Sequence, residues 1–139
     1  MTALGTRLLQ MTIASTDYTA QVSECSIDSA EADSDFVTFQ DTAAGGLRDY
    51  KLKFTAVQDT ATGTLWDKIW TVPGTTVTVL VKPQGGVTAS PANPHYSGNV
   101  IVTEPDGTLL GGEADASPSA RFTIECEWPF TAKPTKVIA

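Results

Sequence analysis

The stretch GTLWDKIWTVPGTTVTVLVKP, residues 63–83, changes its periodicity in the middle. Its first half places large apolar residues four apart, which predicts a short amphipathic helix with one broad apolar face. These residues are Leu65, Trp66, Ile69 and Trp70. Its second half alternates valines with other residues over 75–82, which predicts a β-strand with one buried side. The valines are Val77, Val79 and Val81.

The ends of the predicted helix are marked in the sequence. Thr62 or Thr64 can cap its N-terminus, because a hydroxyl oxygen accepts from the free amides of the first turn. Pro73 and Gly74 end it. A helix of this length is marginally stable alone. We therefore expect it to be a lid on a β core, with all four of its large apolar side chains buried.

Outward from this stretch, the chain consists mainly of strands and turns. Alternation or β-rich composition predicts further strands at 17–29, 36–40, 48–58, 96–104 and 120–128. Gly98 suggests a β-bulge, and Gly- and Pro-rich segments at 83–94 and 105–119 are expected to be long loops. The fold class that follows is mainly β: a β-sandwich or partly open barrel capped by one short α-helix.

The length of 139 residues suits a single domain covering 1–139. We expect residues 1–16 to form an edge strand or an arm. The C-terminal tail, 129–139, carries prolines and is expected to be extended.

Several predicted strands have one polar side. Strand 120–128 turns Glu125 and Glu127 away from its apolar side, and strand 17–29 does the same with Glu24 and Asp28. The expected apolar side of 120–128 is Phe122, Ile124, Cys126 and Trp128. Strand 48–58 places Lys51 and Lys53 opposite Tyr50, Leu52 and Phe54. Antiparallel sheets with one wet face have this pattern.

The net charge of −7 and the lack of any cluster of basic residues argue against tight binding to nucleic acid or to an anionic membrane. The acids are clustered, since 17–35 and 104–115 contain acids and no base. An acidic surface serves solubility, and it also lets a polyanion pass without sticking.

Catalytic signals are weak. His95 is the single histidine and stands in a predicted loop beside Tyr96. No spacing typical of a metal, phosphate or calcium site is present. Trp66 and Trp70 could stack on a sugar, but at helical spacing beside apolar residues they are more typical of a core. We expect no enzyme, no metal and no cofactor.

Cys25 and Cys126 leave two alternatives. They are small core residues of two strands in a reducing cytoplasm, or they form a disulfide if the two strands pair. The N-terminus shows no signal peptide, and no run has membrane-spanning length.

The order of these features resembles the major tail tube proteins of long-tailed, non-contractile bacteriophages, especially those of actinobacterial hosts. The resemblance covers about 17–134 and rests on five segments. These are DYTAQVSECSID, GTLWDKIWTVPGTTVTVLVKPQGG, PHYSGNVIVTEP, GGEADASPSARFTIECEW and a short Pro-containing end. The segment WPFTAKP, residues 128–134, departs from the family pattern. It lacks the glycine that in this family often follows the last strand, the one that ends in tryptophan.

The resemblance implies a structural virion protein that is made in the host bacterial cytoplasm and assembles in the tail. Six copies would form a ring, and rings would stack into a tube through which DNA passes. Sheets would join between subunits around the lumen, while 1–16 and 41–47 would contact neighbouring subunits. The implied partners are further copies, the tape measure protein, and the tail terminator and distal tail proteins.

A channel for DNA is expected to be lined with carboxylates. The candidates for the lumen are Glu24, Asp28, Glu125 and Glu127. Two other functions remain open: a capsid decoration or other virion surface protein with an immunoglobulin-like fold, and a carbohydrate-binding module that uses the tryptophans.

Overall fold

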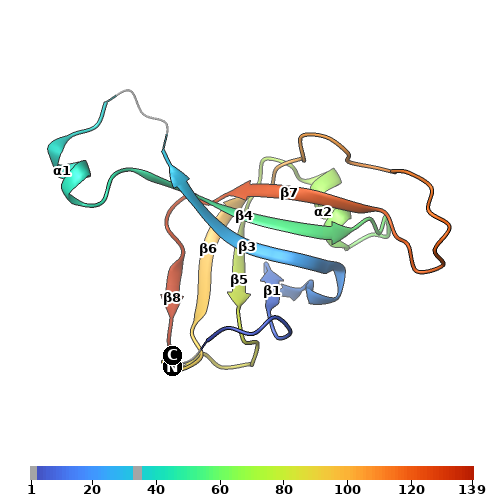
Figure 1. The fold of residues 1–139 in the computed structure, drawn as a ribbon, viewed down its shortest axis with the longest axis horizontal. Coiled ribbons are helices and arrows are strands. Elements are labelled where there is room, and N and C mark those ends of the chain that lie inside the picture. The colour runs from blue at the N-terminus through green and yellow to red at the C-terminus, as the bar shows by residue number, and fades with distance from the viewer. Residues whose placement is uncertain (1–2, 33–35) are drawn as a thin grey trace.

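Two antiparallel sheets form the body of the protein in a computed structural model that describes residues 3–32 and 36–139 (Figure 1). The five-stranded sheet has the order β2-β1-β5-β6-β8. Its strands are β1 Gln10–Ile13, β2 Thr16–Asp17, β5 Thr76–Lys82, β6 His95–Ile101 and β8 Thr135–Val137. The three-stranded sheet has the order β3-β4-β7. Its strands are β3 Val22–Glu31, β4 Arg48–Val57 and β7 Thr123–Pro129.

The core lies between the two sheets and follows the alternation of the strands. Phe54 of β4 and Trp128 of β7 meet edge to face, with ring centroids 4.9 Å apart. The other fully buried strand residues are Met11, Ile13, Leu52, Ala56, Val79, Val100, Ile124 and Cys126. The prediction of a mainly β fold is confirmed, and the two facing sheets are compatible with a sandwich. No closed barrel is formed by the residues described.

One corner links the two sheets. After β7 the chain crosses to the other sheet, where Phe130 forms a bridge with Val100 of β6. The predicted bulge at Gly98 is wrong, because Gly98 pairs regularly with Val79 of β5. A Cβ at Gly98 would lie 2.8 Å from the Phe130 ring. Glycine is needed here because the aromatic ring packs directly on the backbone.

Helix α2, Leu65–Thr71, is the predicted lid. Thr64 is its N-cap and accepts from the Asp67 amide at 3.2 Å. Leu65, Trp66 and Ile69 are buried, as predicted. The prediction for Trp70 is wrong, because this residue is 53% exposed. Only two turns are available, and the Trp70 ring stacks on the outside of the Trp66 ring at 5.3 Å instead of entering the core.

The predicted strand at 36–40 is also wrong. The segment contains helix α1, Phe39–Ala43, so the described residues form two α-helices where one was expected. A capping box starts α1: the Asp41 amide donates to Thr38 Oγ1 at 3.0 Å, and the Thr38 amide donates to Asp41 Oδ2 at 3.1 Å. Away from any neighbouring strand, this local hydrogen bonding decides the conformation.

The two ends of the chain complete the five-stranded sheet. The alternative of an N-terminal arm is wrong for 10–16, since Met11 and Ile13 are buried in the core and β1 pairs with β5. The tail predicted as extended supplies β8, which pairs with β6. Asp33 and Asp35 of the acidic segment 17–35 lie outside the described residues.

Candidate assembly surface on the three-stranded sheet

The outer face of the β3-β4-β7 sheet carries a regular array of charged side chains, here called the charged face. Strand pairing places Thr55 between Glu24 and Glu125 in one cross-strand row. The next row has Lys53 between Ser26 and Glu127. The third row is Asp28, Lys51 and Pro129. Side chains on the opposite face of these strands point to the core.

All four acids predicted to share a surface lie on this face. Glu24, Asp28, Glu125 and Glu127 are exposed, and the two outer strands that carry them flank the lysine-bearing strand β4. Lys51 Nζ lies 3.7 Å from Glu127 Oε2, and both side chains are about half exposed. Such an exposed ion pair contributes little to stability. Four carboxylates against two ammonium groups leave the face with an excess of negative charge.

A charged hollow adjoins this face and adds two acids that the sequence did not place there. It has a volume of about 480 Å³ and lies between β7 and the segment 103–106. Glu104 and Asp106 line it together with Lys53 and Glu125. The acidic segment 104–115 was visible in the sequence, but its position beside β7 depends on the path of the loop.

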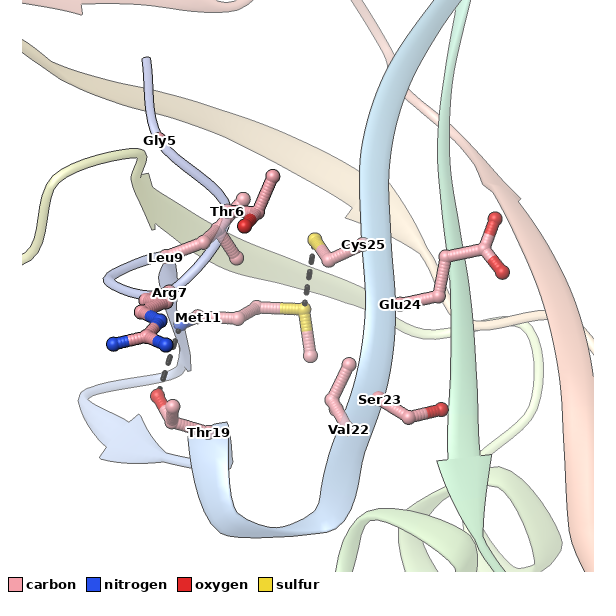
Figure 2. Close-up of a pocket in the computed structure, with 10 residues that line it drawn as sticks. All are labelled: Gly5, Thr6, Arg7, Leu9, Met11, Thr19, Val22, Ser23, Glu24 and Cys25. Atoms are coloured by element: carbon pink, nitrogen blue, oxygen red, sulfur yellow. Dashed lines mark hydrogen bonds between the residues drawn. The ribbon is translucent and has the colours of Figure 1, made fainter.

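The outer edge of β3 is open to pairing. Among the described residues this ten-residue strand pairs with β4 alone, and β7 on the other side of the sheet also pairs with β4 alone. A hollow of about 570 Å³ lies between β3 and the N-terminal segment 5–9. Figure 2 shows the residues that line it. Unpaired backbone groups along a long edge strand are a template for another strand.

The cysteines are core residues, and the disulfide alternative is wrong. Cys25 and Cys126 are free and lie on either side of Phe54, directly opposite it in the sheet. Two strand spacings separate their Cα atoms by about 10 Å, beyond the reach of a disulfide. The Cys25 thiol donates instead to Met11 Sδ at 3.7 Å (Figure 2). Burial raises the pKa of Cys25 to about 11 and that of Cys126 to about 12.

His95 does not lie in a loop as expected. It is the first residue of β6, where it pairs with Val137, and it is buried, with no hydrogen-bond partner for Nε2 among the residues that the structure describes. Within residues 3–32 and 36–139, no group of three or more His, Cys, Asp or Glu side chains is arranged to hold a metal ion.

Two aromatic residues differ from the sequence interpretation. Phe122, predicted on the buried side of 120–128, is 48% exposed and lies just before β7, which begins at Thr123 and not at 120 as predicted. Its ring lies against Gly112. Trp66 is buried and its indole N–H donates to the Leu109 carbonyl at 2.7 Å. Trp66 and Trp70 stack on each other, so they do not present two adjacent open faces to a sugar.

No protein-family model matches the chain, and no curated protein sequence matches it. In the part of the chain that the structure describes, no helix is long and apolar enough to cross a membrane. Any functional argument therefore starts from the surfaces of the molecule.

Proposed function

We propose that this chain is a structural virion protein that polymerises as stacked hexameric rings into the tail tube of a long-tailed, non-contractile phage. The charged face would line the channel through which genomic DNA passes. The observation that carries the proposal is the convergence of Glu24, Asp28, Glu125 and Glu127 on one exposed sheet face. The proposal includes no catalytic step and no cofactor.

The charge of this face suits the passage of DNA. A channel that attracts phosphates would hold the DNA, whereas an excess of carboxylates repels it weakly. Lys51 and Lys53 lie between the acids and moderate the repulsion. At physiological ionic strength the field decays over about 8 Å, so it acts on DNA close to the wall.

The open edges of the same sheet support joining between subunits. The outer edges of β3 and β7 are unpaired in the described residues. If β3 of one copy pairs with β7 of the next, six three-stranded sheets close into one barrel without free edges. The segment 103–106 lies beside β7 and would have to adjust or lie at the rim of that joint.

The partners in this proposal are further copies of the chain, the tape measure protein during assembly, and the tail terminator and distal tail proteins at the ends. DNA would be a transient, non-specific partner. The protein would be made in the host cytoplasm and would function in the virion tail.

Negative-stain microscopy of the purified protein at increasing concentration tests the proposal. We expect six-fold rings and tubes with a central channel. Discrete monomers or trimers under all conditions would contradict it and would favour a capsid decoration protein. Specific retention on immobilised glycans without rings would favour a carbohydrate-binding module.

A further inference from the structure

The β3-β4 hairpin carries an exposed apolar tip. The hairpin extends beyond the body of the two sheets and ends in α1 (Figure 1). We call residues 36–47 the hairpin tip. Phe39 is 96% exposed and Val37 is 53% exposed. With Phe36 and Thr42 they surround a shallow hollow of about 440 Å³. Exposed apolar patches of this kind mark interaction surfaces.

The conformation of the tip is specified locally. The capping box between Thr38 and Asp41 fixes the start of α1, and the pairing of Glu31 with Arg48 continues the ladder to the base of the tip. None of the α1 residues is buried. Within the described residues α1 contributes no side chain to the core, so the exposed Phe39 ring is available for contact with another molecule.

An apolar pocket on the body offers a matching surface. Its volume is about 550 Å³, within the ~300–1,000 Å³ range of pockets that enclose whole ligands. It lies between β3, which supplies Ser26 and Ile27 to its lining, and β8, which supplies Lys136. Its apolar lining includes Leu4, Leu9, Ile27, Val81, Tyr96 and Pro134. Room for an aromatic ring is therefore available.

The charges of the tip and the pocket are complementary. Lys133 and Lys136 belong to the pocket lining, and both residues are exposed. The tip and its base carry three acids, Glu31, Asp41 and Asp49, and one cation, Arg48, which lies opposite Glu31 in the ladder. An acidic, apolar tip matches an apolar pocket flanked by ammonium groups.

The tip cannot fill the pocket of its own chain. Ile27 lines the pocket, and Glu31 lies four residues further along the same strand, about 13 Å away at the rise of a β-strand. Continuous pairing with β4 from Cys25 to Glu31 keeps this strand extended. The middle of β3 lines the pocket, and the extended strand therefore holds the tip away from it.

We propose that the apolar pocket receives the hairpin tip of a second copy of this chain, with Phe39 entering it and Lys133 and Lys136 facing Glu31 and Asp41. This inference rests on the proposed function, since it names a second contact between copies, in addition to the pairing of β3 with β7. The tip and the pocket are different surfaces, so the contact is head-to-tail and generates a ring or a filament.

Photo-crosslinking tests the contact directly. We would place p-benzoylphenylalanine at position 39, mix isotopically light and heavy chains, and map the crosslinks by mass spectrometry. We expect light–heavy crosslinks to residues 4–9, 25–27 or 133–136. The matched control is the same probe at Val87, which is also 96% exposed, and it should not label these residues. Crosslinks within one chain, or to another surface of the second copy, would overturn the proposal.

A charge-reversal series gives an independent readout. Phe39→Ser, and separately Lys133→Glu with Lys136→Glu, should raise the concentration needed for assembly by about tenfold or more. Adding Glu31→Lys to the double reversal should restore part of the loss. Unchanged assembly in the Phe39→Ser variant would refute the contact, with circular dichroism confirming that each variant is folded.

Failure of this contact and failure of the proposed function are distinguishable. Rings or tubes whose position-39 crosslinks map elsewhere would refute the contact and leave the tube proposal intact. A protein that stays monomeric at all concentrations would contradict both.

Discussion

The two helices begin with the same chemistry and have opposite environments. In α1 the Asp41 amide donates to Thr38 Oγ1, and in α2 the Asp67 amide donates to Thr64 Oγ1. Yet α2 buries three large apolar side chains, whereas α1 buries none. Local hydrogen bonding therefore decides where a helix begins, and the surroundings decide whether it serves the core or the surface.

The largest expected difference in stability is between alanine substitutions of an apolar residue in α2 and one in α1. Ile69 in α2 is fully buried and Phe39 in α1 is 96% exposed. Ile69→Ala should lower the free energy of unfolding by about 2–5 kcal/mol because it leaves a cavity. Phe39→Ala should change it by less than about 0.5 kcal/mol, as for other exposed positions. Chemical denaturation of both variants as dilute monomers measures the difference, and equal losses would show that α1 is packed in solution.

The second-largest difference in stability is expected between substitutions of the two N-cap residues. Thr64 is buried, and its single hydroxyl hydrogen lies within reach of the carbonyls of Asp59 and Ala61, to either of which it can donate. Thr64→Ala should destabilise the whole domain by about 0.5–2 kcal/mol. Thr38→Ala removes a cap of similar geometry from a helix outside the core, so its effect should be local.

Hydrogen exchange with denaturation distinguishes these outcomes. In Thr38→Ala, faster exchange should be confined to amides of 38–46, with the global transition unchanged. A global shift as large as that of Thr64→Ala would contradict the separation of the tip from the core.

A smaller effect is expected at Trp70. Its exposed ring stacks on Trp66 without entering the core. Trp70→Ala should therefore destabilise the protein by about 0.5–1.5 kcal/mol, the range for an aromatic pair, instead of the loss expected for a buried tryptophan. Thermal unfolding with fluorescence detection measures this, and a loss above about 3 kcal/mol would indicate that Trp70 belongs to the core.

Much of the fold was predictable where the signal is local. Regular alternation identified β4, β5 and β7, and the i, i+4 spacing identified α2. The strand prediction for 36–40 failed because a short apolar run does not distinguish a strand from a helix. The capping box of Thr38 with Asp41 was the missed signal. The exposure of Trp70 depends on how far the core extends beneath α2, and a local sequence pattern does not give that extent.

The candidate site was predictable only within each strand. Alternation put Glu24 with Asp28 and Glu125 with Glu127, each pair on one side of its own strand. That β3 and β7 flank the same partner is a property of the sheet order, which brings together residues about one hundred positions apart. Glu104 and Asp106 join the charged hollow through a loop whose path no periodicity describes.

The central claim is that the charged face lines a channel in a polymer of this chain. A density map of the assembled particle by electron cryomicroscopy tests it most directly. We predict that Glu24, Asp28, Glu125 and Glu127 of every copy point into the lumen. A particle with these four side chains on its outer surface would contradict the account.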